Sequence, residues 1–339
     1  MAHDIRPTIA LAMGDPCGIS PELTAHLMAL PTIREAMHLI VIGDVRVLSD
    51  GADIAKVAPT FEAVQTVDAI PQRAENHLFV DLGTLDPATI TRGSASQVGG
   101  TFALANFRAS LDLAKSGRVS AVTFTPFNKA AMRMADPAYD DEISFVARAC
   151  GTTAPASEFN ILDGLWNARV TSHIALKDVA ERITTEAVLR GLQLTDASMR
   201  QAGYSTPRIA LAALNPHGGD NGNFGREEID ILEPAVAAAK RGGLAVEGPF
   251  PADTVFVRAK AGQFDAVLTL YHDQGQIAMK LMGFDRGVTL LGGFPFPICT
   301  PAHGTAYEIA GKGIANTGAA CAALLLAARL ASHRARAAT

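Results

Sequence analysis

The chain is poor in cysteine, aromatic residues and clustered charge. Its 339 residues include four cysteines and no Cys-x-x-Cys pair, so neither a zinc-thiolate cluster nor a disulfide framework is indicated. The formal net charge is −5, and the lack of a basic block argues against nucleic-acid binding. No apolar stretch approaches the roughly 18 residues of a membrane span, and the first residues, MAHDIRP, contain no apolar signal-peptide core. We therefore expect a cytoplasmic protein that acts on a small molecule, with no membrane or nucleic-acid partner.

A Gly-x-Gly-x-x-Gly fingerprint is also missing. The first apolar run, residues 8–13, continues as Gly-Asp-Pro-Cys-Gly, which does not match that pattern. A standard Rossmann site for a dinucleotide is therefore disfavoured. Any dinucleotide must bind in another way.

What the chain does contain is alternation between two kinds of segment. Hydrophobic residues make up 48% of the sequence, and cores stop growing near roughly 250–300 residues, so two domains are expected. Short apolar runs typical of buried parallel strands alternate with stretches of helical period, which predicts an α/β fold. The predicted strands are residues 8–13, 39–42, 121–124, 208–214 and 266–270, and the predicted helices are residues 101–115, 184–202, 226–240 and 317–335.

Three histidines each follow a strand-like run. They are His173 in TSH, His217 in LNPHGGDNG and His272 in YHDQG. A single histidine in such a place is more often a hydrogen-bonded structural residue. Imidazoles from separate strand ends can also converge on one divalent cation and leave coordination positions open, as catalytic sites require. Asp273 and Gln274 would then support the ligands or handle protons. The residues alone leave both interpretations open.

Two further stretches combine small residues with polar ones. The segment HGTAYEIAGKGIANTG, residues 303–318, allows close backbone approach and suits an adenosine moiety, although glycine-rich loops often only turn the chain. In GDPCGISPEL, residues 14–23, Ser20 is a predicted N-cap and Glu22 is placed to favour the helix dipole. In PFNK, Asn128 is a candidate cap, and Lys129 is either an anion contact or a solvated lysine.

These motifs occur in the order found in one family. GDPCGISPEL, TPFNKAAM, LNPHGGDNG, GPFPADTVF, YHDQG and GKGIAN together resemble the 4-hydroxythreonine-4-phosphate dehydrogenase (PdxA-like) family of the isocitrate/isopropylmalate dehydrogenase superfamily. The resemblance implies two α/β/α lobes with a cleft between them. The first lobe, residues 1–126 plus 301–339, would take the nucleotide, and the second, residues 127–300, would carry the metal, the substrate and the dimer contact. It also implies a homodimer with shared active sites.

The same resemblance implies roles for individual residues. His173, His217 and His272 match the divalent-metal ligands, for Zn, Mg, Mn or Co, and are shared across the dimer. Lys280 matches a substrate contact with a possible catalytic role, and Asp273 would orient His272 or act as a base. The implied reaction is oxidation of a small hydroxy acid by NAD, with NADP as an alternative, often followed by decarboxylation. The expected cofactor contacts are Asp15, His303, Gly304, Glu308 and Gly311.

The substrate positions depart from the family pattern. Glu142 and Ile143 stand where the family has His and Thr, Thr289 where it has Asn, and Ile298 where it has Arg. The loss of an imidazole and a guanidinium, together with the gain of the Glu142 carboxylate, would weaken binding of a doubly charged phosphate. The substrate shell is therefore expected to be altered. Alternatives are a cis-dihydrodiol of an aromatic acid such as terephthalate, or a four-carbon acid-sugar phosphate. A metal-dependent hydrolase and a non-catalytic nucleotide-binding protein are less favoured.

Overall fold

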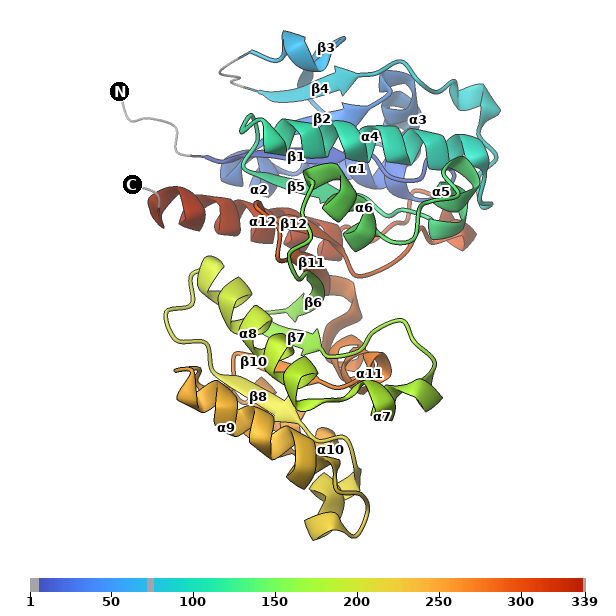
Figure 1. Ribbon diagram of the computed structural model, residues 1–339. Coiled ribbons are helices and arrows are strands. Elements are labelled where there is room, and N and C mark those ends of the chain that lie inside the picture. The colour runs from blue at the N-terminus through green and yellow to red at the C-terminus, as the bar shows by residue number, and fades with distance from the viewer. Residues whose placement is uncertain (1–5, 72–75, 338–339) are drawn as a thin grey trace. The chain divides into compact units, whose positions relative to one another are not determined.

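The computed structural model describes residues 6–71 and 76–337, and it confirms the α/β fold (Figure 1). The chain divides into two compact units, Met1–Ala154 with Phe294–Thr339, and Pro155–Gly293. The sequence suggested borders at 126/127 and 300/301 instead. Residues 127–154 join the first unit because their helices pack on helix α4 (Gln97–Lys115).

The contact between α4 and residues 129–135 requires a glycine at position 100. A Cβ on Gly100 would lie 1.9 Å from the carbonyl oxygen of Ala131, so any larger residue would push the two helices apart.

The first unit contains a parallel sheet in the order β3-β4-β2-β1-β5-β12. Its central strands are apolar on both faces, as strands covered by helices on both sides must be, and Ile9 and Val41 are fully buried. The strands are β1 (Thr8–Ala12), β2 (His38–Gly43), β3 (Phe61–Val64), β4 (His77–Asp81), β5 (Ala121–Phe124) and β12 (Ile298–Pro301).

Helix starts in the first unit test two capping predictions. Asn128 caps α5 as expected, because its side-chain oxygen accepts a hydrogen bond from the Ala131 amide at 2.9 Å. Ser20 was wrongly predicted as a cap, since it is the first residue of α1 and its hydroxyl donates to the carbonyl of Pro126 at 2.9 Å. Besides α4, the helices are α1 (Ser20–Ala29), α2 (Pro31–Ala36), α3 (Val45–Ala55), α5 (Lys129–Ala135), α6 (Glu142–Cys150) and α12 (Gly318–Ala337).

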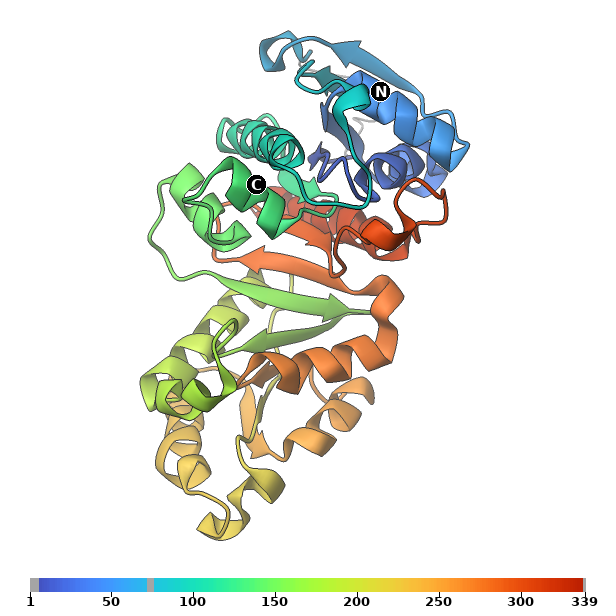
Figure 2. The same ribbon diagram turned by 90° about the vertical axis from the view of Figure 1, so that its right-hand side faces the viewer.

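The second unit has a mixed sheet in the order β11-β6-β7-β10-β8-β9 (Figures 1 and 2). Strands β11, β6 and β7 pair antiparallel, whereas β7, β10, β8 and β9 run parallel. The strands are β6 (Ser157–Leu162), β7 (Leu165–Arg169), β8 (Ile209–Ala212), β9 (Val246–Phe250), β10 (Ala266–Thr269) and β11 (Val288–Gly292). The helices are α7 (Val179–Arg182), α8 (Thr185–Gln201), α9 (Glu233–Arg241), α10 (Ala252–Lys260) and α11 (His272–Gly283).

Two sequence-level expectations can be checked across both units. Within residues 6–71 and 76–337, no helix combines the length and the apolarity needed to cross a bilayer. The four cysteines are free; Cys17 and Cys299 are buried, while Cys150 and Cys321 are partly exposed.

Candidate active site

The three histidines follow three neighbouring strands of the second unit. Strand β10 lies between β7 and β8, and all three run parallel, so their carboxyl ends meet at one edge of the sheet. His173 follows β7, His272 follows β10 and His217 follows β8. Ligands collect at this edge in open α/β sheets. The strand order therefore brings three chain segments that are far apart in sequence to the same edge of the sheet.

His173 and His272 lie beside each other. Their ring centroids are 5.6 Å apart with an interplanar angle of 42°. His272 begins helix α11, and its Nδ1 lies 2.6 Å from a carboxylate oxygen of Asp273. If Nδ1 carries the proton of that hydrogen bond, Nε2 keeps its lone pair for a ligand. The pair has the spacing and the chemistry to supply two imidazole ligands to a divalent cation.

His217 lies apart from this pair. It sits in the turn Pro216–Gly222, where it and the next five residues have positive φ, and its ring centroid lies 6.3 Å from that of Phe224. Buried Glu228 holds the start of this loop by accepting the amides of Leu214 and Asn215, both at 2.8 Å. Among the residues that the structure describes, no three His, Cys, Asp or Glu side chains form a metal-binding group. One chain thus assembles two of the three predicted ligands.

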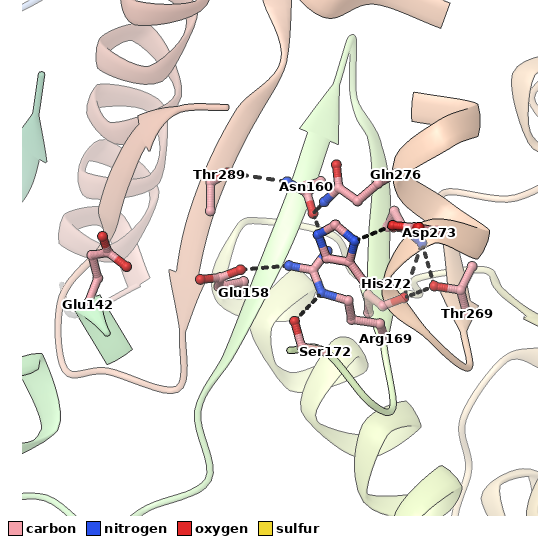
Figure 3. A network of polar contacts seen from close by, with 12 residues as sticks. Glu142, Glu158, Asn160, Arg169, Ser172, Thr269, His272, Asp273, Gln276 and Thr289 are labelled. Atoms are coloured by element: carbon pink, nitrogen blue, oxygen red, sulfur yellow. Dashed lines mark hydrogen bonds and ion pairs between the residues drawn. The ribbon is translucent and has the colours of Figure 1, made fainter. Parts of the chain in front are cut away.

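A buried polar layer lies between α11 and the sheet (Figure 3). Its centre is Arg169, the last residue of β7, whose guanidinium donates to Glu158 and to the side-chain oxygen of Asn160, each at 2.6 Å. The same oxygen of Asn160 accepts a hydrogen bond from Gln276 of α11, and the Asn160 amide nitrogen donates to Thr289 at 3.2 Å. Burial lowers the pKa of Arg169, and the Glu158 carboxylate opposes this shift. The sequence analysis missed this layer, although a lone arginine four residues before His173 was a visible signal.

The predicted catalytic residues Asp273 and Lys280 both belong to α11. The Asp273 side chain is 71% exposed apart from its contact with His272. Lys280 is exposed, with its ammonium 6.0 Å from the ring centroid of Phe284. The same face of the helix exposes apolar side chains, with Ile277 60%, Leu281 84% and Phe284 55% exposed. An exposed apolar stripe of this kind is typical of a protein contact surface.

In the first unit, Asp15 is turned inward. It is 1% exposed, accepts a hydrogen bond from the Tyr307 hydroxyl, and accepts the Cys17 amide at 2.8 Å. Burial raises the pKa of Asp15, and these hydrogen bonds oppose the shift. Tyr307 belongs to the predicted nucleotide loop, so Asp15 holds that loop in the present structure. The sequence analysis did not single out Tyr307.

Glu22 is the second buried carboxylate that holds the nucleotide loop. One of its oxygens accepts the amides of Gly311 and Gly313 at 3.1 and 3.4 Å, and its other oxygen is buried without a partner. In the same loop, Nε2 of His303 is also buried without a partner, and a Cβ built on Gly304 would meet no atom within 4 Å. The loop Glu308 is exposed. An unpartnered imidazole nitrogen beside open backbone fits a site that accepts a polar ligand.

The predicted substrate residues have different surroundings. Glu142 forms an ion pair with Lys129 at 3.0 Å, so its charge is balanced, and its neighbour Ile143 is partly buried. Thr289 is committed to the polar layer through Asn160. Ile298 is fully buried in β12, where it pairs with Val122, and it offers no surface to a ligand in this structure.

These features define an α/β oxidoreductase class with a histidine-bearing unit and a separate unit that holds a glycine-rich loop. The model of the family described as pyridoxal phosphate biosynthetic protein PdxA matches residues 35–327, and the chain belongs to this family. The proteins of this family matched here are named dehydrogenases, which act on CH–OH groups, and this chain is an oxidoreductase of that kind.

Three relatives illustrate the similarity. The chain is 60% identical over 330 residues to the Rhizobium meliloti (strain 1021) protein named "Putative 4-hydroxythreonine-4-phosphate dehydrogenase 2", covering 97% of this chain and 94% of that one. It is 36% identical to the "Putative D-threonate 4-phosphate dehydrogenase" of Halalkalibacterium halodurans, covering 97% and 98% of the two chains. A crystal structure of 4-hydroxythreonine-4-phosphate dehydrogenase from Klebsiella pneumoniae has a TM-score of 0.83 and 32% identity, covering 96% of this chain and 99% of that one.

Proposed function

We propose that this protein is an NAD-dependent and divalent-metal-dependent dehydrogenase of a small hydroxy acid. The observation that carries the proposal is the pair of imidazoles, His173 and His272, set 5.6 Å apart at the carboxyl edge of parallel strands. Family membership supports the oxidoreductase class.

The residues of the second unit divide the work. His173 and His272 would hold a divalent cation, which would lower the pKa of a substrate hydroxyl and favour its deprotonation as hydride leaves. Asp273 would keep His272 in the tautomer that presents Nε2, because its carboxylate lies 2.6 Å from Nδ1. Exposed Lys280 is free to approach an anionic group of the substrate. Decarboxylation of the oxidised product is the expected second step, and release of carbon dioxide would measure it.

The nucleotide would bind along the loop that follows β12. Asp15 and Glu22 hold this loop by hydrogen bonds, and the backbone at Gly304 stays open to a ligand, while Nε2 of His303 is buried and still lacks a partner. Exposed Glu308 would repel a 2′-phosphate, so NAD is preferred to NADP. This site differs from a Rossmann site because the loop, rather than a glycine fingerprint after the first strand, approaches the dinucleotide.

Phosphorylated hydroxy acids are the first substrates to test. The names of the relatives point to phosphates of four-carbon acids and of 4-hydroxythreonine. The ion pair between Glu142 and Lys129 removes one objection to an anionic substrate, because the carboxylate is already balanced. 4-Hydroxythreonine 4-phosphate and D-threonate 4-phosphate are the two candidates within this class. A cis-dihydrodiol of an aromatic acid is the alternative that needs no phosphate contact.

A homodimer would complete the site. One chain brings two imidazoles together and leaves His217 apart, so we infer that the third ligand comes from His217 of a second copy. Ile277 and Leu281 of the apolar stripe lie on the helix that begins with His272, and Phe284 follows directly after that helix, so a dimer contact through the stripe would be continuous with the site. A cytoplasmic location remains a prediction that cell fractionation can check.

NADH formation tests the proposal directly. Absorbance at the NADH band is followed with 4-hydroxythreonine 4-phosphate, D-threonate 4-phosphate and an aromatic cis-dihydrodiol, each with Mg, Mn, Co or Zn. We expect oxidation of one class, loss of activity with a chelator, and loss with His217→Ala. Turnover without nucleotide would indicate a hydrolase, and NAD binding without oxidation of any substrate would indicate a non-catalytic protein.

A further inference from the structure

The buried polar layer beneath α11 joins the two chain segments that carry His173 and His272. We propose that Arg169 is a positioning residue that fixes these two histidines relative to each other. The inference rests on the proposed function, because metal binding is its main consequence. The inference goes beyond that function, because the hydrogen bonds of the Arg169 guanidinium go to Ser172, Asn160 and Glu158, so Arg169 would act on the two histidines through other residues.

The first connection runs toward His173. Arg169 ends β7, and its Nε donates to the hydroxyl of Ser172 at 3.0 Å. Ser172 is the residue immediately before His173, and it lies where the chain leaves the sheet. A side chain that ties this exit to the strand limits the directions in which His173 can point.

The second connection runs toward His272. The guanidinium donates to Asn160 at 2.6 Å, and the same Asn160 oxygen accepts from Gln276. Gln276 lies one helical turn after His272, on the buried side of α11. Between them, Gly275 sits directly on Asn167, since a Cβ there would lie 2.1 Å from the Asn167 side-chain oxygen. The first turn of α11 is therefore seated on the layer in one position.

Arginine is suited to this place for geometric reasons. Its rigid fork sends N–H groups in three fixed directions, here to Ser172, Asn160 and Glu158. The Arg169 side chain is 2% exposed, so a neutral hydrophobic residue would be at least as stabilising in most settings. Retention of a buried cation at this position is better explained by the geometry that it imposes than by its contribution to stability.

A double variant without charge tests the proposal. Arg169→Met with Glu158→Gln removes the fork and leaves no carboxylate stranded. We expect Co²⁺, titrated by calorimetry and visible absorption on the full-length protein, to bind at least about tenfold more weakly, because outer-shell contacts typically carry 10–100-fold in metal affinity. NAD affinity should stay unchanged. The single variant Arg169→Lys should also bind Co²⁺ more weakly than the wild type, because an ammonium keeps the charge but cannot donate in the three directions of a guanidinium.

Two further variants separate positioning from stability. Ser172→Ala deletes only the connection to His173, and a two- to fivefold loss of Co²⁺ affinity is expected. The matched control is Arg208→Met with Asp265→Asn, which removes a bidentate ion pair at the amino-terminal ends of β8 and β10 and should leave Co²⁺ binding unchanged. In the metal-free Ser172→Ala protein, amide exchange should rise at residues 170–175 and not across the whole unit.

The outcomes decide between the two proposals. Wild-type Co²⁺ affinity in the Arg169/Glu158 double variant would overturn the positioning role, and so would an equal loss in the Arg208 control. If the double variant does not fold, unchanged Co²⁺ affinity in Ser172→Ala overturns it. If the wild-type protein binds no Co²⁺, the proposed function fails instead, and the exchange measurement alone then decides whether the connection orders this segment.

Discussion

The two units prepare ligand sites in opposite ways. In the first unit, buried carboxylates of Asp15 and Glu22 hold a loop through Tyr307 and backbone amides, so that the loop presents its backbone at Gly304. In the second unit, exposed imidazoles stand at strand ends above a buried polar layer. A nucleotide is large and can be recognised by a shaped backbone, whereas a cation needs a few side-chain atoms held at fixed spacing. Substitutions should therefore affect one site without the other.

Replacing a ligand histidine should give the largest effect. His272→Ala removes one imidazole of the pair, so Co²⁺ affinity should fall sharply and metal-dependent activity should fall at least about 1,000-fold, or about 4 kcal/mol of barrier. NAD affinity, measured by fluorescence titration, should change less than twofold. A comparable loss of NAD binding would show that the two sites are not separable.

The first unit should show a pH dependence that comes from His77. His77 is 3% exposed, and burial lowers its pKa to about 4, helped by the nearby charges of Arg34, His38 and Arg6. Below the unfolded-state pKa of 6.5, the unfolded chain binds more protons than the folded one. The free energy of unfolding should therefore fall as the pH drops from about 6.5 to about 4, by about 3 kcal/mol.

Hydrogen exchange can locate this pH effect. Amides of β2 and β4 should exchange faster at pH 4.5 than at pH 7 after correction for the intrinsic rate. His77→Asn is the control, because its side-chain oxygen can still accept the Leu39 amide that Nδ1 accepts at 3.2 Å but does not titrate. If exchange in β2 and β4 rises equally between pH 7 and pH 4.5 in His77→Asn, groups other than His77 cause the effect.

Weakening the support of the nucleotide loop should have a more moderate effect. Glu22→Gln keeps the size of the side chain and removes the charge that attracts the amides of Gly311 and Gly313. NAD affinity should fall about tenfold, about 1.4 kcal/mol, while Co²⁺ affinity should not change. Calorimetric titration with each ligand separately checks both statements, and a loss in Co²⁺ binding would contradict the comparison.

Sequence could predict the parts of this molecule whose pattern is local. The strands near residues 8–13, 121–124 and 266–270 were found because they are apolar on both faces. The three histidines were found because each follows such a run or a short strand. Strand β6 was missed because Asn160 interrupts its apolar pattern. The strand-like run before His173 was placed at residues 169–172, whereas β7 is Leu165–Arg169, because Asn167 and Arg169 interrupt the apolar pattern of this strand.

Other features depended on tertiary contacts. Glu142 was predicted to oppose an anionic substrate, but its ion pair with Lys129, thirteen positions earlier, could not be inferred from either motif. Glu22 was explained by a helix dipole, whereas its contacts are amides almost 300 residues away. Ile298 was aligned as a substrate position, and its burial in β12 depends on the pairing with β5. Motifs identify which residues matter, and partners distant in sequence decide what those residues do.

The smallest effect expected concerns Asp273. Its side chain is 71% exposed, so solvent screens its interaction with His272 and a substitution should cost little stability. Asp273→Asn keeps a hydrogen-bond acceptor near Nδ1 but removes the charge. We therefore expect Co²⁺ affinity to fall only about three- to tenfold, a small effect for a residue that hydrogen-bonds to a metal ligand. If Asp273 were instead the general base, kcat would fall by at least about 100-fold with Co²⁺ affinity nearly unchanged. Measuring Co²⁺ affinity and kcat in the same variant therefore distinguishes a residue that orients His272 from one that removes a proton.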